Sequence, residues 1–364
     1  MKIRNITDYL EEIAPLHLQE SYDNSGLIIG DLENIVQGCL ITLDCTEEVI
    51  DEAVRKKCNL IIAHHPIIFN PLKKIVGNSY VERTIIKAIK NDIAVYAIHT
   101  NLDNVYGGVN SKIAEKLGLI NCEILLPKNK FLKQLVVYCP LTHSEALKKA
   151  MLDNGAGSFT NYDNCSFSST GQATFRPKEG SSPFVGDIGE IYDSKEVRLE
   201  FFLEKDTENS LIKLMQENHP YEQVAYQIYT LDNFSHEIGS GMIGDLSSEI
   251  ESEIFMNFIK KQMHTDCIRH TQLINKQIKR VAICGGSGSF LLQQAKNKKA
   301  DIFISSDFKY HEFFDADKKI IIADIGHFES EQFTKELIYD FLRKKFTKFA
   351  VQLSNVNTNP INYL

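Results

Sequence analysis

Short apolar runs alternate with amphipathic segments in the first and last thirds of the chain, and this alternation constrains the fold more than any other feature. Apolar runs without polar alternation are typical of parallel strands that are buried on both faces. The runs that predict strands lie at residues 38–44, 59–63, 93–98, 280–284, 301–305, 319–324 and 348–353. The segments that predict helices lie at residues 47–57, 80–90, 108–117 and 329–345. Both flanking thirds are therefore predicted to be α/β, built from βαβ units.

The middle of the chain has a different pattern. Strands are predicted at residues 133–139, 197–204 and 224–230, helices at 143–154 and 208–218, and a glycine- and serine-rich stretch lies between the two halves. This order suggests a ferredoxin-like module. Because the flanking thirds resemble each other more than either resembles the middle, we predict one split core domain with an insertion. Its lobes are residues 1–128 and 233–364, and the inserted domain is residues 129–232.

Composition narrows the functional classes. The net charge of -8 over 364 residues argues against a nucleic-acid-binding protein. The N-terminal segment has no apolar core like that of a signal peptide, and no apolar stretch approaches the roughly 20 residues that cross a bilayer. The eight cysteines form no C-x-x-C pair, as expected for reduced thiols. We therefore expect a cytoplasmic protein with no membrane or nucleic-acid partner.

Two adjacent histidines follow the apolar run at residues 60–63. Neighbouring side chains in an extended segment point to opposite sides, so His64 and His65 would not easily chelate one ion. Two neighbouring metal ions, each bound by one imidazole, would use both residues. This pair therefore suggests a dinuclear site, provided that other segments contribute further ligands.

Two further clusters of metal-ligand residues also follow predicted strands. His99 and Asp103 come after the strand at 93–98, and His327 and Glu331 come after the strand at 319–324. Ligand sites in α/β sheets lie at the carboxyl ends of strands. Nitrogen and carboxylate ligands suit Zn, Mn, Fe or Co, and Glu331 could bridge two ions. Each residue alone has an ordinary alternative, such as an Asx turn for Asp103 or a helix-dipole contact for Glu331.

Four segments resemble the NIF-three-like family, also called GTP cyclohydrolase I type 2 homologues. They are residues 22–30 (YDNSGLIIG), 63–69 (AHHPIIF), 98–103 (IHTNLD) and 326–331 (GHFESE). The resemblance implies two α/β lobes around a cleft that holds two divalent metal ions (Zn, Fe or Mn). It also implies an inserted PII/CutA-like domain and a toroidal homohexamer. The metal ligands that it implies are His64, His65, Asp103, His327 and Glu331.

The sequence departs from the family pattern at two places. Tyr22 stands where tryptophan is frequent in the family, and an aromatic tyrosine is expected to keep the packing role of that residue. Residues 305–307 read Ser-Ser-Asp where Thr-Gly-Asp is common, so the backbone there is less free to approach a ligand. These departures bear on the substrate more than on the metal.

Other residues are candidates for catalysis or binding. His99, Asp307, His311 and Glu312 could transfer protons near a metal ion, although His311 and Glu312 could equally be solvated residues at a helix start. Residues 285–289 (GGSGS) could receive an anion or form a plain strand-to-helix turn. Cys284 precedes this loop without an evident base, which favours a structural thiol.

The resemblance and the ligand set lead to two functional hypotheses. The first is a metal-dependent hydrolase that acts on a nucleotide-like or other small polar substrate. The family name implies opening of the GTP imidazole ring with loss of formate. The second is a non-enzymatic, oligomeric metal-binding or metabolite-sensing scaffold, because PII/CutA-like modules bind small effectors and form trimers.

Overall fold

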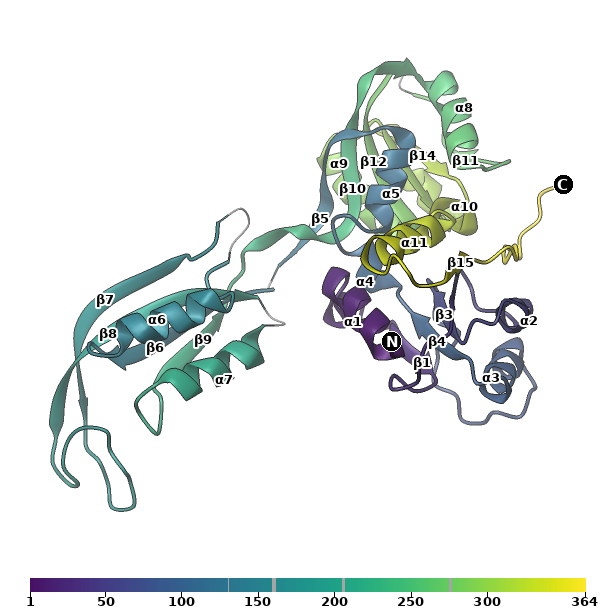
Figure 1. The fold of residues 1–364 in the computed structure, drawn as a ribbon. Coiled ribbons are helices and arrows are strands. Elements are labelled where there is room, and N and C mark those ends of the chain that lie inside the picture. Colours follow the sequence, from purple (N-terminus) through teal and green to yellow (C-terminus); the bar gives the residue numbers. More distant parts are fainter. Residues whose placement is uncertain (130, 159–161, 205–206, 275–276) are drawn as a thin grey trace. The chain divides into compact units, whose positions relative to one another are not determined.

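The computed structural model describes residues 1–129, 131–158, 162–204, 207–274 and 277–364. The chain forms two compact units, one made of Met1–Pro127 with His236–Leu364 and the other of Lys128–Ser235 (Figure 1). Each unit has its own hydrophobic core. Within the described residues, no helix combines the length and the apolarity needed to cross a membrane.

A five-stranded sheet in the order β1-β4-β3-β2-β15 forms the first half of the larger unit. Its strands are β1 (Gly26–Ile29), β2 (Cys39–Thr42), β3 (Leu60–Ala63), β4 (Ala94–Ala97) and β15 (Val351–Leu353). The last four are mutually parallel, and β1 runs antiparallel to β4. Although β15 lies at the end of the chain, it pairs with β2.

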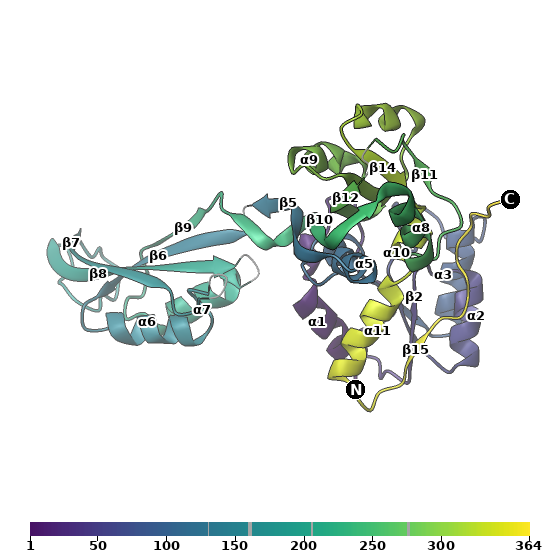
Figure 2. The same cartoon turned by 90° about the horizontal axis from the view of Figure 1, so that it is seen from above.

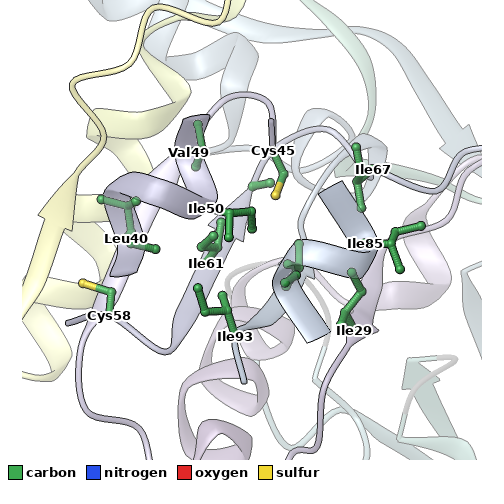
Figure 3. Packing of buried hydrophobic residues seen from close by; sticks show 14 residues of the cluster. Ile29, Leu40, Cys45, Val49, Ile50, Cys58, Ile61, Ile67, Ile85 and Ile93 are labelled. Atoms are coloured by element: carbon green, nitrogen blue, oxygen red, sulfur yellow. The ribbon is translucent and has the colours of Figure 1, made fainter. Parts of the chain in front are cut away.

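Helices cover the first sheet. They are α1 (Ile3–Ile13), α2 (Glu47–Arg55), α3 (Tyr80–Lys90) and α11 (Thr334–Lys345). The hydroxyl of Thr46 accepts from the Val49 N–H at the start of α2, and Ser79 caps α3 in the same way. Leu40 and Ile61 of the strands pack against Ile50 and other apolar residues of α2 and α3 (Figure 3). Burial on both faces explains why the strands are continuously apolar.

A six-stranded sheet in the order β11-β14-β13-β12-β10-β5 forms the second half of the larger unit. Its strands are β5 (Ile120–Asn129), β10 (Phe234–Glu251), β11 (Arg269–His270), β12 (Gln277–Ser287), β13 (Ile302–Ser306) and β14 (Ile321–Asp324). Strands β12, β13 and β14 are parallel, as the alternating pattern predicts, and β10 and β11 run antiparallel to their neighbours β12 and β14. The helices of this half are α4 (Thr100–Asp103), α5 (Val109–Leu117), α8 (Ser252–Gln262), α9 (Leu292–Asn297) and α10 (His327–Glu331).

The single helix predicted at residues 329–345 is wrong, because two helices occupy this region. Helix α10 ends at Glu331, and α11 begins at Thr334. Gln332 and Phe333 separate the two helices. The side-chain amide of Gln332 donates to the carbonyl oxygens of Met263 and Glu329, and the side chain of Phe333 is buried. Because of the break, α10 packs against β12 and β13 of the six-stranded sheet, while α11 packs against β15 and β2 of the five-stranded sheet.

The smaller unit has the element order βαββαβ. Its elements are β6 (Leu132–Pro140), α6 (Ser144–Asp153), β7 (Ser166–Phe175), β8 (Tyr192–Glu204), α7 (Glu208–Asn218) and β9 (Tyr226–Thr230). The sheet order is β7-β8-β6-β9 with antiparallel pairs, which is a ferredoxin-like topology. Helices α6 and α7 lie on one face of the sheet (Figure 2). Strand β7 occupies part of the glycine- and serine-rich stretch, where the sequence pattern predicts no strand. Its side chains are mostly exposed, so it carries no apolar pattern.

Candidate metal centre

The carboxyl ends of strands from both sheets of the larger unit meet at one place. His64 and His65 directly follow β3, and Asp103 ends the short helix α4 beyond β4. His327 and Glu331 begin and end α10, which follows β14. Ligand atoms lie within 4.8 Å of one another in three overlapping groups, which are His65, His327 and Glu331, then His64, Asp103 and Glu331, and finally His64 and His65 with His99. The structure thus brings together the five residues that the resemblance implies as metal ligands.

Glu331 lies at the centre of the cluster and belongs to two groups. Its Oε2 is 2.9 Å from Nε2 of His65 and 3.1 Å from Nε2 of His327. Its Oε1 is 3.8 Å from Nε2 of His64, which is also 3.7 Å from Oδ1 of Asp103. One carboxylate therefore faces a group with His65 and His327 through one oxygen, and a group with His64 and Asp103 through the other.

Each of these imidazoles is held through its Nδ1 atom. The Nδ1 atom of His64 is 2.8 Å from the Ile98 carbonyl oxygen. The Nδ1 atom of His65 is 2.7 Å from Oδ1 of Asp44, and that of His327 is 2.6 Å from Oδ2 of Asp307. Such contacts fix ring orientation and make Nδ1 the donor, which leaves the Nε2 lone pair directed into the cluster. This is the arrangement that metal-binding histidines require.

Two buried polar atoms in the cluster fit a cation. Nε2 of His64 and Oδ1 of Asp103 are buried without a hydrogen-bond partner among the described residues. Unpaired buried polar atoms are costly and rare, so their presence calls for an explanation. Two ligands that each lie about 2.1 Å from one ion are roughly 3–4 Å apart, the separation found between these atoms. The donor set and its spacing therefore fit divalent metal ions.

Without an ion, protons stabilise the carboxylates of the cluster. Burial lowers the pKa of His65, but the hydrogen bonds with Asp44 and Glu331 outweigh burial and raise it to about 10. The negative charge of Glu331 raises the pKa of His327 to about 11. Burial, reinforced by Glu331, raises the pKa of Asp103 to about 7. Metal ions would displace such protons, because they bind neutral imidazole and ionised carboxylate.

His99 adjoins the same cluster from the end of β4. Its ring centroid is 5.2 Å from that of His64 and 5.3 Å from that of His65. Its Nδ1 is 2.7 Å from Oδ1 of Asp23, and the other carboxylate oxygen, Oδ2, accepts from the Thr100 hydroxyl. Burial raises the pKa of Asp23, but the hydrogen bond with His99 and the other donors outweigh burial and hold it well below its usual range. The Asp23 carboxylate thus orients His99.

The glycine-rich segment packs beneath the Glu331 carboxylate, and its residues 285–287 form the end of β12, where the sequence predicts a turn after the strand. The Gly286 N–H donates to the Ser330 hydroxyl at 2.9 Å, and its carbonyl accepts from the hydroxyls of Ser305 and Ser306 at 3.0 and 2.6 Å. Gly286 has φ +62, and a Cβ atom there would lie 2.4 Å from Oε1 of Glu331. Only glycine leaves room for the carboxylate at this position. The two serines noted as a departure from the family pattern therefore anchor this segment.

Two further candidates lie differently. The ring of His311 packs near Tyr310 and Phe314, with centroids 5.2 and 6.3 Å away. Glu312 accepts a hydrogen bond from the backbone of Lys309. Neither residue belongs to the metal-ligand groups found among the described residues. Cys284 is buried beside the cluster, and burial raises the pKa of its thiol well above its usual value.

Sequence reasoning missed three supporting residues. Asp44 and Asp23 hold His65 and His99, and the hydroxyl of Thr358 donates to Oδ2 of Asp44 at 2.6 Å. Asp44 follows β2, the neighbour of β3, so the strand-end rule that found the histidines could have found Asp44 as well. Thr358 lies in the irregular C-terminal segment, where no local pattern marks it.

A cavity of about 480 Å³ opens beside the cluster, which is within the size range of small-molecule sites. His65, His99, Asp103, His327 and Glu331 all line it. The C-terminal segment forms part of its wall through residues 359–361, and the Asn359 amide donates to Oε1 of Glu329 at 2.9 Å. The residues that could hold metal are therefore accessible to a small ligand.

Comparisons with known proteins agree with the sequence motifs. A Bacillus subtilis protein named GTP cyclohydrolase 1 type 2 homolog is 38% identical over 367 residues, covering 99% of this chain and 98% of the relative. A Halalkalibacterium halodurans protein of the same name is 37% identical over 372 residues, covering 100% of both chains. The profile of the Duf34/NIF3 (NGG1p interacting factor 3) family matches residues 1–360.

Solved structures have the same fold. The crystal structure of a Bacillus cereus protein related to NIF3 has a TM-score of 0.85 at 38% identity, covering 100% of this chain and 99% of that chain. A Staphylococcus aureus protein has a TM-score of 0.81 at 31% identity, with the same coverage. The mixed α/β fold is thereby confirmed. The chain belongs to the DUF34/NIF3 family.

Proposed function

We propose that this protein binds two divalent metal ions and is a metal-dependent hydrolase of a small polar, ring-containing substrate. The observation that carries the proposal is the pair of ligand groups that share Glu331, one with His65 and His327 and the other with His64 and Asp103. A shared carboxylate is the usual bridge between two ions about 3.5–4 Å apart. Zn, Fe and Mn all suit this donor set.

Divalent ions at this site would polarise the bond under attack and lower the pKa of water. The protein's own groups would do the rest. Asp44 and Asp307 hold His65 and His327 in the required orientation, and Asp23 orients His99 toward the cavity. His99 is placed to accept a proton from attacking water and to deliver it to the leaving nitrogen. Hydrolysis of a carbon–nitrogen bond would add the water oxygen to carbon and its proton to nitrogen.

The name of the relatives, GTP cyclohydrolase 1 type 2 homolog, supports a ring-opening hydrolysis. In such a reaction the substrate ring would enter the cavity beside His99 and the shared carboxylate. We propose hydrolysis of a ring carbon–nitrogen bond as the reaction class, in a cytoplasmic setting.

Elemental analysis of the purified protein tests the metal site. We expect about two divalent ions per chain, and loss of both from a His64→Ala/His65→Ala variant that keeps its circular dichroism spectrum. His311→Ala is the matched control, because it removes an imidazole outside the cluster. Unchanged metal content in the double variant would overturn the assignment. Turnover of a panel of cyclic amides and heterocycles that Glu331→Gln abolishes would support the hydrolase.

A second candidate is a metal-binding or metabolite-sensing scaffold that assembles into homo-oligomers, proposed here as hexamers. It is favoured by the smaller unit, which has its own core and a ferredoxin-like topology, as expected for a PII/CutA-like module. Light scattering of the intact protein tests the assembly, and a monomer would contradict it. An absence of turnover in the metal-loaded oligomer would favour the scaffold over the hydrolase.

A further inference from the structure

The cavity beside the metal centre is lined by acids and by no basic side chain longer than histidine among the described residues. The carboxylates that line it belong to Glu20, Asp44, Asp103 and Glu331. No lysine or arginine of the described chain is among the lining residues. Two divalent ions would bring four positive charges, which these carboxylates already balance. A ligand with several negative charges would therefore meet no net attraction there.

Two further carboxylates lie behind histidines that line the cavity, and they add negative charge to its surroundings. Asp23 lies behind His99, with Oδ1 2.7 Å from Nδ1 of the imidazole, and Asp307 lies behind His327, with Oδ2 2.6 Å from Nδ1. Lys335 is close enough to Asp44 for their charges to interact, but it does not line the cavity. The surroundings thus offer little to compensate a polyanion.

The glycine-rich segment does not supply the missing anion contacts. Phosphate-binding loops present free backbone N–H groups. Here the Gly285 N–H donates to Oδ1 of Asn110 at 3.0 Å, and the Gly286 N–H donates to the Ser330 hydroxyl at 2.9 Å. The helix that follows, α9, has only six residues. The N–H groups of the two glycines beside Glu331 are therefore already used within the protein and are not available to a phosphate group.

The mouth of the cavity is aromatic. Tyr22 is 62% exposed, Phe69 is 45% exposed and Phe290 is 63% exposed, and all three line the cavity. The ring centroid of Phe69 is 6.1 Å from that of Tyr22 and 6.3 Å from that of His99. These rings make a surface that leads from the solvent to the histidine cluster. Exposed aromatic rings gathered at one cavity are typical of a ligand site, and they stack well on planar heterocycles.

We propose that the cavity accepts a planar nitrogen heterocycle without phosphate groups, of nucleobase or nucleoside size, which stacks on Phe69. The charges around the cavity give a nucleoside triphosphate no net attraction, so it should bind more weakly than the nucleoside. This inference rests on the proposed hydrolase function and specifies its substrate class. The proposed substrate differs from GTP, which the name of the relatives mentions. A heterocyclic ring suits the cavity, whereas a triphosphate does not.

Isothermal titration calorimetry with guanosine, GMP and GTP tests the inference on metal-loaded and on metal-free protein. We expect affinity to fall along this series, with GTP binding roughly tenfold or more weakly than guanosine in both states. Phe69→Ala should weaken guanosine binding by about tenfold, since stacking on an aromatic side chain contributes of this order. Phe314→Ala is the matched control, because this phenylalanine is 67% exposed and lies outside the cavity.

A gain of function completes the test. Ser287 is exposed and lines the cavity, so Ser287→Lys places a cation on the wall and should strengthen GTP binding without strengthening guanosine binding. The inference is overturned if GTP binds as tightly as guanosine, if guanosine does not bind at its solubility limit, or if Phe69→Ala has no effect. Metal content measured on the same samples reports separately on the proposed metal centre, and the order of affinities in metal-free protein decides the substrate class even if no ions are found.

Discussion

Replacement of Gly286 by alanine should empty the metal centre while leaving the protein folded. The new Cβ would lie 2.4 Å from Oε1 of Glu331 and 3.3 Å from Cε1 of His327. The peptide around Gly286 cannot easily retreat, because its N–H and carbonyl oxygen are held by three serine hydroxyls. The Glu331 carboxylate, at the end of a flexible side chain, must move instead.

The size of this movement decides the outcome. An ordinary contact between a methyl carbon and an oxygen is about 3.3 Å, so the carboxylate must shift by roughly 0.9 Å. Metal–ligand distances tolerate deviations of only about 0.2 Å. The fold itself should lose about 1–2 kcal/mol, the cost of a non-glycine residue in the left-handed region. Gly286→Ala should therefore bind at most a small fraction of the wild-type metal.

Gly118→Ala is the matched control. Gly118 has φ +66, close to that of Gly286, but a Cβ atom there would meet nothing within 4 Å. Urea unfolding in the presence of a chelator should show similar losses of stability in both variants, and elemental analysis should show loss of metal only in Gly286→Ala. Full metal content in Gly286→Ala, with stability equal to that of Gly118→Ala, would refute the placement of Glu331 at the centre of the site.

The remaining predictions concern residues that support the site and the smaller unit. Thr358→Val removes the donor to Asp44 and should weaken metal binding roughly tenfold in a chelator competition, whereas Thr358→Ser should not. Asp307→Asn removes the charge beside His327 and should cost about 10- to 100-fold in the same assay, and unchanged affinity would contradict a role for that contact. Burial lowers the pKa of His219, one of whose ring nitrogens accepts from a backbone N–H. The unfolded chain therefore binds this proton more readily, so the free energy of unfolding should fall as the pH decreases below about 6.5. A pH series of urea melts should show a smaller slope for His219→Leu.

Much of the fold could be predicted because strands that are buried on both faces leave a clear pattern in the sequence. Strands β2, β3, β4, β13 and β14 are covered on both faces, so their residues must be continuously apolar, and their positions followed directly. Strand β7 was missed because most of its side chains are exposed and show no pattern. The break between α10 and α11 was missed because Phe333 continues the apolar face of the predicted helix.

The residues of the candidate site could be found for a related reason. His64, Asp103 and His327 each follow a predicted strand, and parallel strands bring their carboxyl ends to one edge of a sheet. The supporting carboxylates of Asp23 and Asp44 escaped notice because aspartate is common in loops. Asp44 becomes meaningful only when the His65 ring is found 2.7 Å away.

The sequence by itself determined the buried parallel strands of the larger unit and the identity of the residues that could bind metal, because burial and ligand chemistry are local properties of residue types. The tertiary structure decided how those residues work together. It brings His65 and Glu331 to within 2.9 Å although 266 positions separate them along the chain. It returns β15 to the first sheet, so that the segment after it reaches Asp44. It also lines the cavity with acids and aromatic rings. Such proximities depend on long-range packing, which no periodicity within a segment records.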